Sequence, residues 1–96
     1  MDYLLNKGFT VEDINRIIDK YDDDIIDNCK YTYSNIEDVI DYLKEFGVVD
    51  IPGLMLERID IFFVSTNVLK RIFSHYNKSY IINSLDKEPD LFDEWE

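Results

Sequence analysis

The amino-acid sequence predicts an all-α protein, a small array of five to seven short helices. Three observations predict this fold class. Apolar residues recur at the spacing of one helical face in several segments, and residues that commonly cap helices stand before those segments. The chain of 96 residues, 46% of them apolar, has enough apolar side chains for one modest core but not for two domains.

Three short helices are expected before residue 34. An opening helix is expected over residues 2–7, ending at Gly8. Thr10 is expected to cap a second helix, with acids in its first turn, where the helix dipole favours negative charge. Its apolar stripe is expected to consist of Ile14, Ile17, Ile18 and Tyr21. Asp23 or Asp24 is then expected to cap a third, short helix.

The clearest helix runs from Ser34 to Gly47 and is expected to be the central pillar of the array. Ser34, with Glu37 three residues later, has the pattern of a capping box. Gly47 supplies the left-handed residue that commonly closes a helix. The apolar side chains follow the i, i+3, i+4, i+7 spacing of one helical face, at Ile36, Val39, Ile40 and Leu43.

Beyond the pillar, Asp50 is expected to cap a short helix with a proline in its first turn. Residues 59–64 suit a helix or a strand, and pairing them with residues 80–82 would give an α+β fold instead. Ser65 or Thr66 is expected to cap the next helix. The chain then divides into an acidic helical domain, residues 1–86, and an acidic, aromatic C-terminal tail, residues 87–96.

A short motif occurs twice, as Tyr3-Leu4 before Gly8 and as Tyr42-Leu43 before Gly47, at a spacing of 39 residues. The first copy continues as Leu4-Leu5-x-x-Gly8-Phe9-Thr10-x-Glu12-Asp13-Ile14-x-x-Ile17-Ile18. Together with residues 42–48 and 62–65, this pattern resembles the helical repeat of the mitochondrial transcription termination factor (mTERF-like) family. The resemblance covers about residues 3–76 and implies two repeats of three short helices in a curved solenoid. For the twofold occurrence of the short motif, the alternative is chance similarity in a chain rich in Ile, Tyr and Asp.

The charge balance is the strongest global feature. Twenty-one acidic and ten basic side chains give a net charge of −11. Residues 1–60 hold 15 acids and 6 bases, whereas residues 61–85 hold three bases and no acid. Such a chain repels phosphate backbones over most of its surface and attracts basic partners. The alternative is that the acids only keep the protein soluble.

The favoured hypothesis is a non-catalytic binding protein whose carboxylates engage a basic protein surface. In one version the acids mimic nucleic-acid phosphates and block a nucleic-acid-binding protein, as small acidic inhibitors from phages and mobile elements do. Two acidic groups are the candidate partner-binding residues: Asp19, Asp22, Asp23, Asp24 and Asp27 in the first, and Glu37, Asp38, Asp41 and Glu45 on the pillar.

Three further hypotheses come from other segments. Lys70, Arg71 and Lys78 would be the contacts of a nucleic-acid-binding helical repeat like that of the mTERF-like family. In the tail, Leu91, Phe92 and Trp95 share one helical side, so they either fill a groove on a partner or anchor the tail on this protein's own core. Phe62, Phe63 or the tail would hold the subunits of a homo-oligomer together.

No enzyme, metal or cofactor is expected. The acids from Asp19 onward fail the EF-hand template, which needs a glycine at position six and a glutamate at position twelve, where this chain has Asp24 and Lys30. One cysteine and one histidine allow no zinc spacing. A cytoplasmic location is expected for three reasons. Cys29 is the only cysteine, the N-terminus does not look like a signal peptide, and the longest strictly apolar run is four residues.

Overall fold

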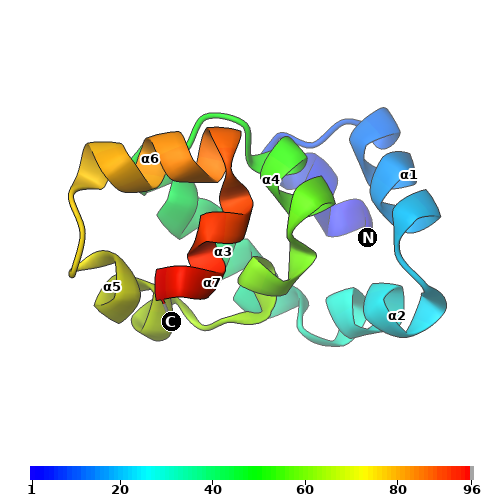
Figure 1. Ribbon diagram of the computed structural model, residues 1–96. Helices are drawn as coiled ribbons and strands as arrows, with labels where there is room; N and C mark the ends of the chain where they lie inside the picture. Colours follow the sequence, from blue (N-terminus) through cyan, green and yellow to red (C-terminus); the bar gives the residue numbers. More distant parts are fainter. Residues whose placement is uncertain (96) are drawn as a thin grey trace.

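The computed structural model describes residues 1–95, and it confirms the all-α prediction (Figure 1). Seven α-helices and three 3₁₀ segments (η) follow one another, with no strand in that range. Their bounds are η1 (Asp2–Lys7), α1 (Val11–Lys20), α2 (Asp23–Tyr31), α3 (Tyr33–Phe46), α4 (Ile51–Glu57), η2 (Ile59–Phe63), α5 (Thr66–Phe73), α6 (Lys78–Lys87), η3 (Pro89–Leu91) and α7 (Phe92–Trp95). None of these helices is long and apolar enough to cross a membrane.

The α3 helix occupies the centre of the molecule, which measures 33 × 23 × 22 Å. It packs against η1, α2, α4, η2 and α5. Its predicted apolar stripe is confirmed, because Ile36, Val39, Ile40 and Leu43 are all completely buried. In Figure 1 the pair α1 and α2 lies at one end, α5 and α6 lie at the other, and α4 and α7 lie between them.

Hydrogen bonds from polar side chains to backbone carbonyls join these elements across the core. The amide of Asn35 on α3 donates to the carbonyl oxygens of Phe62 and Val64, at 3.1 and 3.0 Å. The hydroxyl of Tyr21 donates to the carbonyl of Leu56 at 2.7 Å, so the end of α1 is fixed to the end of α4. These bonds satisfy carbonyls that no regular helix would pair.

The alternative α+β pairing is wrong. Residues 59–63 form η2, and residues 80–82 lie inside α6. Both faces of η2 are covered, since Ile59, Ile61 and Phe62 are all buried. Its apolar residues therefore follow neither the spacing of a helix nor that of a strand. Burial of Phe62 also removes it from any subunit contact.

Most of the predicted helix ends are confirmed. Thr10 caps α1 through a capping box with Asp13, and Asp50 caps α4 by accepting the N–H of Gly53 at 3.0 Å. Ser65 caps α5. The capping box predicted at Ser34 is wrong, because α2 ends at Tyr31 and α3 begins only two residues later, which leaves Ser34 inside the helix.

The start of α2 also differs from the prediction, by a single residue. Its N-cap is Asp22, with Asp23 already in the first turn. Helix ends assigned from a run of identical residues are uncertain by about this much, since each aspartate can serve as the cap.

The repeated glycine motif marks two equivalent helix ends that lie side by side. Gly8 ends η1 with φ of 90°, and Gly47 ends α3 with φ of 113°, both in the left-handed region. In each case the residue after the glycine donates its N–H back to the repeated leucine, Phe9 to Leu4 and Val48 to Leu43. A lysine then links the two ends, because Lys44 donates to the carbonyl of Lys7.

We expect Gly47→Ala to lower the free energy of unfolding by about 2 kcal/mol, more than Gly8→Ala. Both substitutions place an L-residue at positive φ, which costs about 1–2 kcal/mol. A Cβ at Gly47 would also lie 3.1 Å from the Cδ1 of Ile82, whereas one at Gly8 would meet only the Lys44 ammonium at 3.6 Å. Urea denaturation of the two variants measures the difference. Equal losses would show that Ile82 moves aside without cost.

Candidate binding surfaces

The first acidic group forms a corner where α1 joins α2, at the end of the molecule away from α5 (Figure 1). We call these residues the acidic corner: Asp19, Asp22, Asp23, Asp24 and Asp27. All five side chains are exposed. Among the described residues, none of them has a Lys or Arg nitrogen within 4.0 Å, so their charge faces solvent. No three acidic, Cys or His side chains of residues 1–95 are grouped so that they could hold a metal ion.

Beside the acidic corner lies an apolar groove between η1, α1 and α2, with a volume of 440 Å³. Ile14 and Ile26 form its floor, each only 7% exposed. Leu5, Val11 and Ile18 form its walls and remain 45%, 62% and 42% exposed. Three contiguous half-exposed aliphatic side chains are more than the scattered apolar residues that any surface carries.

The rim of the groove is acidic. Asp2, Asp23 and Asp27 line it, with Lys30 as the only base among the lining residues. Two of these carboxylates belong to the acidic corner, so the corner and the groove form one continuous surface. An apolar floor with a negative rim is complementary to a partner that is apolar on one side and basic around it.

The sequence did not reveal this groove. Ile18 was expected on the buried stripe of α1, but only Ile14 and Ile17 of that stripe are fully buried. Val11, Ile14 and Ile18 fall at i, i+3 and i+7, which makes a second apolar stripe on the same helix. That second stripe was the available signal.

The pillar acids lie in a different environment. Asp41 forms an ion pair with Lys7 at 3.0 Å. Asp38, Asp41 and Glu45 also line a groove of 520 Å³ whose other residues include Lys70 and Lys78. Glu37 is partly buried. The pillar surface therefore carries both signs of charge and is a weaker candidate than the acidic corner for a purely basic partner.

The three bases proposed to contact nucleic acid are not brought together. The Lys70 ammonium lies over the ring of Tyr42, at 5.6 Å from its centre, and that of Lys78 lies 5.1 Å from the centre of Phe46. Arg71 instead lines a separate pocket with His75 and Trp95. Two lysines beside three carboxylates offer little net attraction to phosphates.

The tail packs on its own domain. Phe92 and Trp95 are only 1% and 6% exposed, and Leu91 is partly buried. The indole of Trp95 contacts Phe73 edge-on and lies against the rings of Tyr76 and Tyr80, with centres 5.6 and 5.7 Å away. The burial of Phe92 and Trp95 fits the alternative in which the tail is anchored on this protein's own core, whereas Leu91 keeps part of its surface exposed.

Arg58 fixes the same tail from the other side. Its guanidinium is paired with Asp60 at 2.8 Å, with Asp93 at 2.7 Å and with Asp90 at 3.4 Å. It also lies over the ring of Phe92, with its Cζ 5.8 Å from the ring centre. The hydrogen bonds to Asp60 raise the pKa of Arg58 above its ordinary value, and the same bonds lower the pKa of Asp60. Two acids of the tail are thereby engaged within the molecule.

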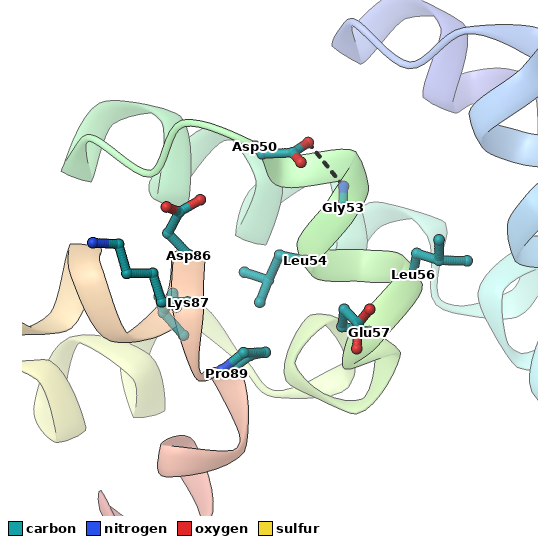
Figure 2. Close-up of a pocket in the computed structure, with 9 residues that line it drawn as sticks. Asp50, Gly53, Leu54, Leu56, Glu57, Asp86, Lys87 and Pro89 are labelled. Atoms are coloured by element: carbon teal, nitrogen blue, oxygen red, sulfur yellow. Dashed lines mark hydrogen bonds between the residues drawn. The ribbon is translucent and has the colours of Figure 1, made fainter.

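A third acidic surface surrounds a cleft between α4 and α6, with a volume of 360 Å³ (Figure 2). Asp50 and Asp86 lie at one rim, and Leu54 projects between the two helices. The Lys87 ammonium points away from Leu54 in Figure 2. Asp50 already serves as the cap of α4, which makes it a poor candidate for contacting a ligand in this cleft.

The two residues best suited to nucleophilic chemistry are poorly placed for it. Cys29 is completely buried, and burial raises the pKa of its thiol to about 11. His75 is exposed after α5, at the end of the molecule away from α2 (Figure 1). A reactive cysteine needs an accessible thiolate, which this environment disfavours.

No protein-family model, curated protein or solved structure matches the chain. The resemblance to the mTERF-like repeat therefore stays a prediction.

Proposed function

We propose that this chain is a non-catalytic acidic binding protein that engages a basic protein surface through the acidic corner. The observation that carries the proposal is the set of five exposed carboxylates, Asp19 to Asp27, with no cation within 4.0 Å in the part of the chain that the structure describes. Some acids elsewhere are paired with Lys7, Arg16 or Arg58, whereas no residue of the acidic corner is paired with a described cation. Charge left unpaired at one end of a molecule is available to a partner.

In its specific form, the acidic corner takes the place of nucleic-acid phosphates and inhibits a nucleic-acid-binding protein. Double-stranded DNA presents a dense row of negative charges, and basic proteins bind it largely through those charges. Five acids within the nine residues from Asp19 to Asp27 offer a similarly dense negative field. The single buried cysteine and the lack of a long apolar helix among the described residues support a cytoplasmic site of action.

The test is displacement of DNA from basic proteins. Host-cell proteins that bind heparin are mixed with a labelled DNA duplex, and the chain is added until half of the duplex is released. We expect Asp19, Asp22, Asp23 and Asp24, all changed to Asn, to raise the half-displacing concentration at least about tenfold at low salt. The measurement is a gel-shift titration at about 50 mM and about 300 mM salt.

The matched control neutralises four exposed acids elsewhere: Glu57→Gln, Asp86→Asn, Glu88→Gln and Glu94→Gln. Each variant loses four negative charges, so both change the net charge from −11 to −7. Equal effects of the two variants, or no displacement by the natural chain, would overturn the proposal. Direct binding of the chain to the duplex that is lost with Lys70→Ala and Arg71→Ala would favour the nucleic-acid-binding alternative instead.

A further inference from the structure

We propose that the groove between η1, α1 and α2 binds one face of a cationic amphipathic helix of the partner. The inference rests on the proposed function for the sign of the partner's charge, and it adds the shape of the segment that is bound. Its basis is the apolar floor of Ile14 and Ile26, which lies beside the acidic corner.

The apolar side chains that α1 contributes to the groove are long enough, taken together, to lie along a bound helix. Val11, Ile14 and Ile18 span two turns of α1, about 10 Å along its axis. A helix that lies in a groove inserts apolar side chains at i, i+3 or i+4 and i+7, which cover the same length. The stripe on α1 and the stripe on such a ligand therefore match turn for turn.

The charge of the groove's rim indicates which residues should flank the apolar stripe of the bound helix. Asp2, Asp23 and Asp27 place three carboxylates around the apolar floor, and Lys30 is the one basic side chain that lines it. Asp19 and Asp22 of the acidic corner extend this field beyond the groove. Lysine or arginine residues that flank the apolar stripe of the ligand would lie against these carboxylates, whereas acidic residues there would be repelled.

Two other occupants are disfavoured by the structure. A second copy of the chain would bring two acidic rims together, in a protein whose net charge is −11. The C-terminal tail is held elsewhere, with Trp95 against α5 and α6 and Asp93 on Arg58. The charge of the rim therefore points to a basic partner.

The test uses two synthetic peptides of about 18 residues, long enough to form an isolated helix. Both contain the same leucines and lysines. In one, the leucines form an i, i+3, i+4, i+7 stripe, and in the other they are scattered over all faces. We expect the striped peptide to bind at least about tenfold more tightly, measured by fluorescence anisotropy. The variant Leu5→Ser, Val11→Ser, Ile18→Ser should abolish this preference, and NMR amide shifts should lie on α1 and α2.

The controls separate the groove from the acidic corner. Tyr31→Ser with Val49→Ser changes two apolar residues that are 86% and 85% exposed and do not line the groove, so binding should stay unchanged. Equal affinity for the two peptides would overturn the proposal that the groove binds a helix. The proposed function would still stand if the four Asp→Asn changes weakened the binding of both peptides. The proposal would also be overturned if the natural chain formed a dimer and the three Ser changes dissociated that dimer, because the groove would then hold a second copy of the chain.

Discussion

Trp95→Ala should lower the free energy of unfolding by about 3 kcal/mol, because truncating a buried tryptophan typically costs 3–5 kcal/mol. Trp95 is 6% exposed and contacts four aromatic rings, those of Phe73, Tyr76, Tyr80 and Phe92. Its indole N–H also donates to the hydroxyl of Tyr80 at 3.4 Å. Urea denaturation followed by far-UV circular dichroism measures the loss.

The neighbouring residue supplies the control for this prediction. Glu94 is exposed and forms no ion pair among the described residues, so Glu94→Gln should change stability by no more than about 0.5 kcal/mol. The emission of the single tryptophan reports the same packing without a mutation, and it should be blue-shifted until the protein unfolds. A loss below about 1 kcal/mol for Trp95→Ala would mean that the tail contributes little to the core.

Cys29 should react with thiol reagents at least about a hundredfold more slowly in the folded protein than in the unfolded chain. Burial raises the pKa of its thiol from 9.0 to about 11, and each unit lowers the reactive thiolate fraction at neutral pH about tenfold. The side chain is also completely inaccessible. Alkylation rates at pH 8 with and without urea measure the ratio, with Val49→Cys as the exposed control. Comparable rates for Cys29 in both states would contradict the burial of α2.

The raised pKa of the Cys29 thiol also makes the stability of the fold sensitive to alkaline pH. Because the folded protein holds the Cys29 proton to higher pH than the unfolded chain does, its contribution to stability is complete below pH 9 and is lost as the pH rises through about 11. The pKa of Tyr3 is also raised, chiefly by burial, and its hydroxyl donates to the carbonyl of Cys29 at 2.8 Å. Loss of the Tyr3 proton would remove that bond as well.

The parts of the fold that the sequence predicted were those with local causes. The stripe from Ile36 to Leu43 has an unbroken helical period, and the glycines Gly8 and Gly47 end helices by a backbone conformation that other residues rarely adopt. Caps at Thr10 and Asp50 were predictable for the same reason, since each needs only a side chain and an N–H three residues later.

The parts that the sequence did not predict depend on tertiary neighbours. Ser34 has the pattern of a cap, but α2 ends at Tyr31 and α3 already begins at Tyr33, with Thr32 as its N-cap, so Ser34 lies inside the helix. Whether Trp95 packs inward is decided by the aromatic residues that α5 and α6 bring to it. Ile18 stays 42% exposed although Ile17 beside it is completely buried, because the packing of α1 against its neighbours covers only part of the predicted stripe.

The sequence names the five acids of the acidic corner, but it does not show that they lack ion pairs among the described residues while a pillar acid, Asp41, has one. Sequence spacing placed both acidic sets on outward faces, and only the fold shows which cations approach them. Lys7 is 34 residues away from Asp41 in the chain and still forms its ion pair. Pairings over such distances follow from helix packing and carry no local signal.

The positions of Met1, Cys29 and Val49 together decide where a reporter group can be attached. Met1 lines the groove and Trp95 fills the aromatic cluster, so a dye or surface linkage beside either one would disturb a feature under test. Val49, in the loop after α3, is 85% exposed. With Cys29 unreactive, one cysteine introduced there would be modified selectively, giving a single-site handle on an otherwise unaltered molecule.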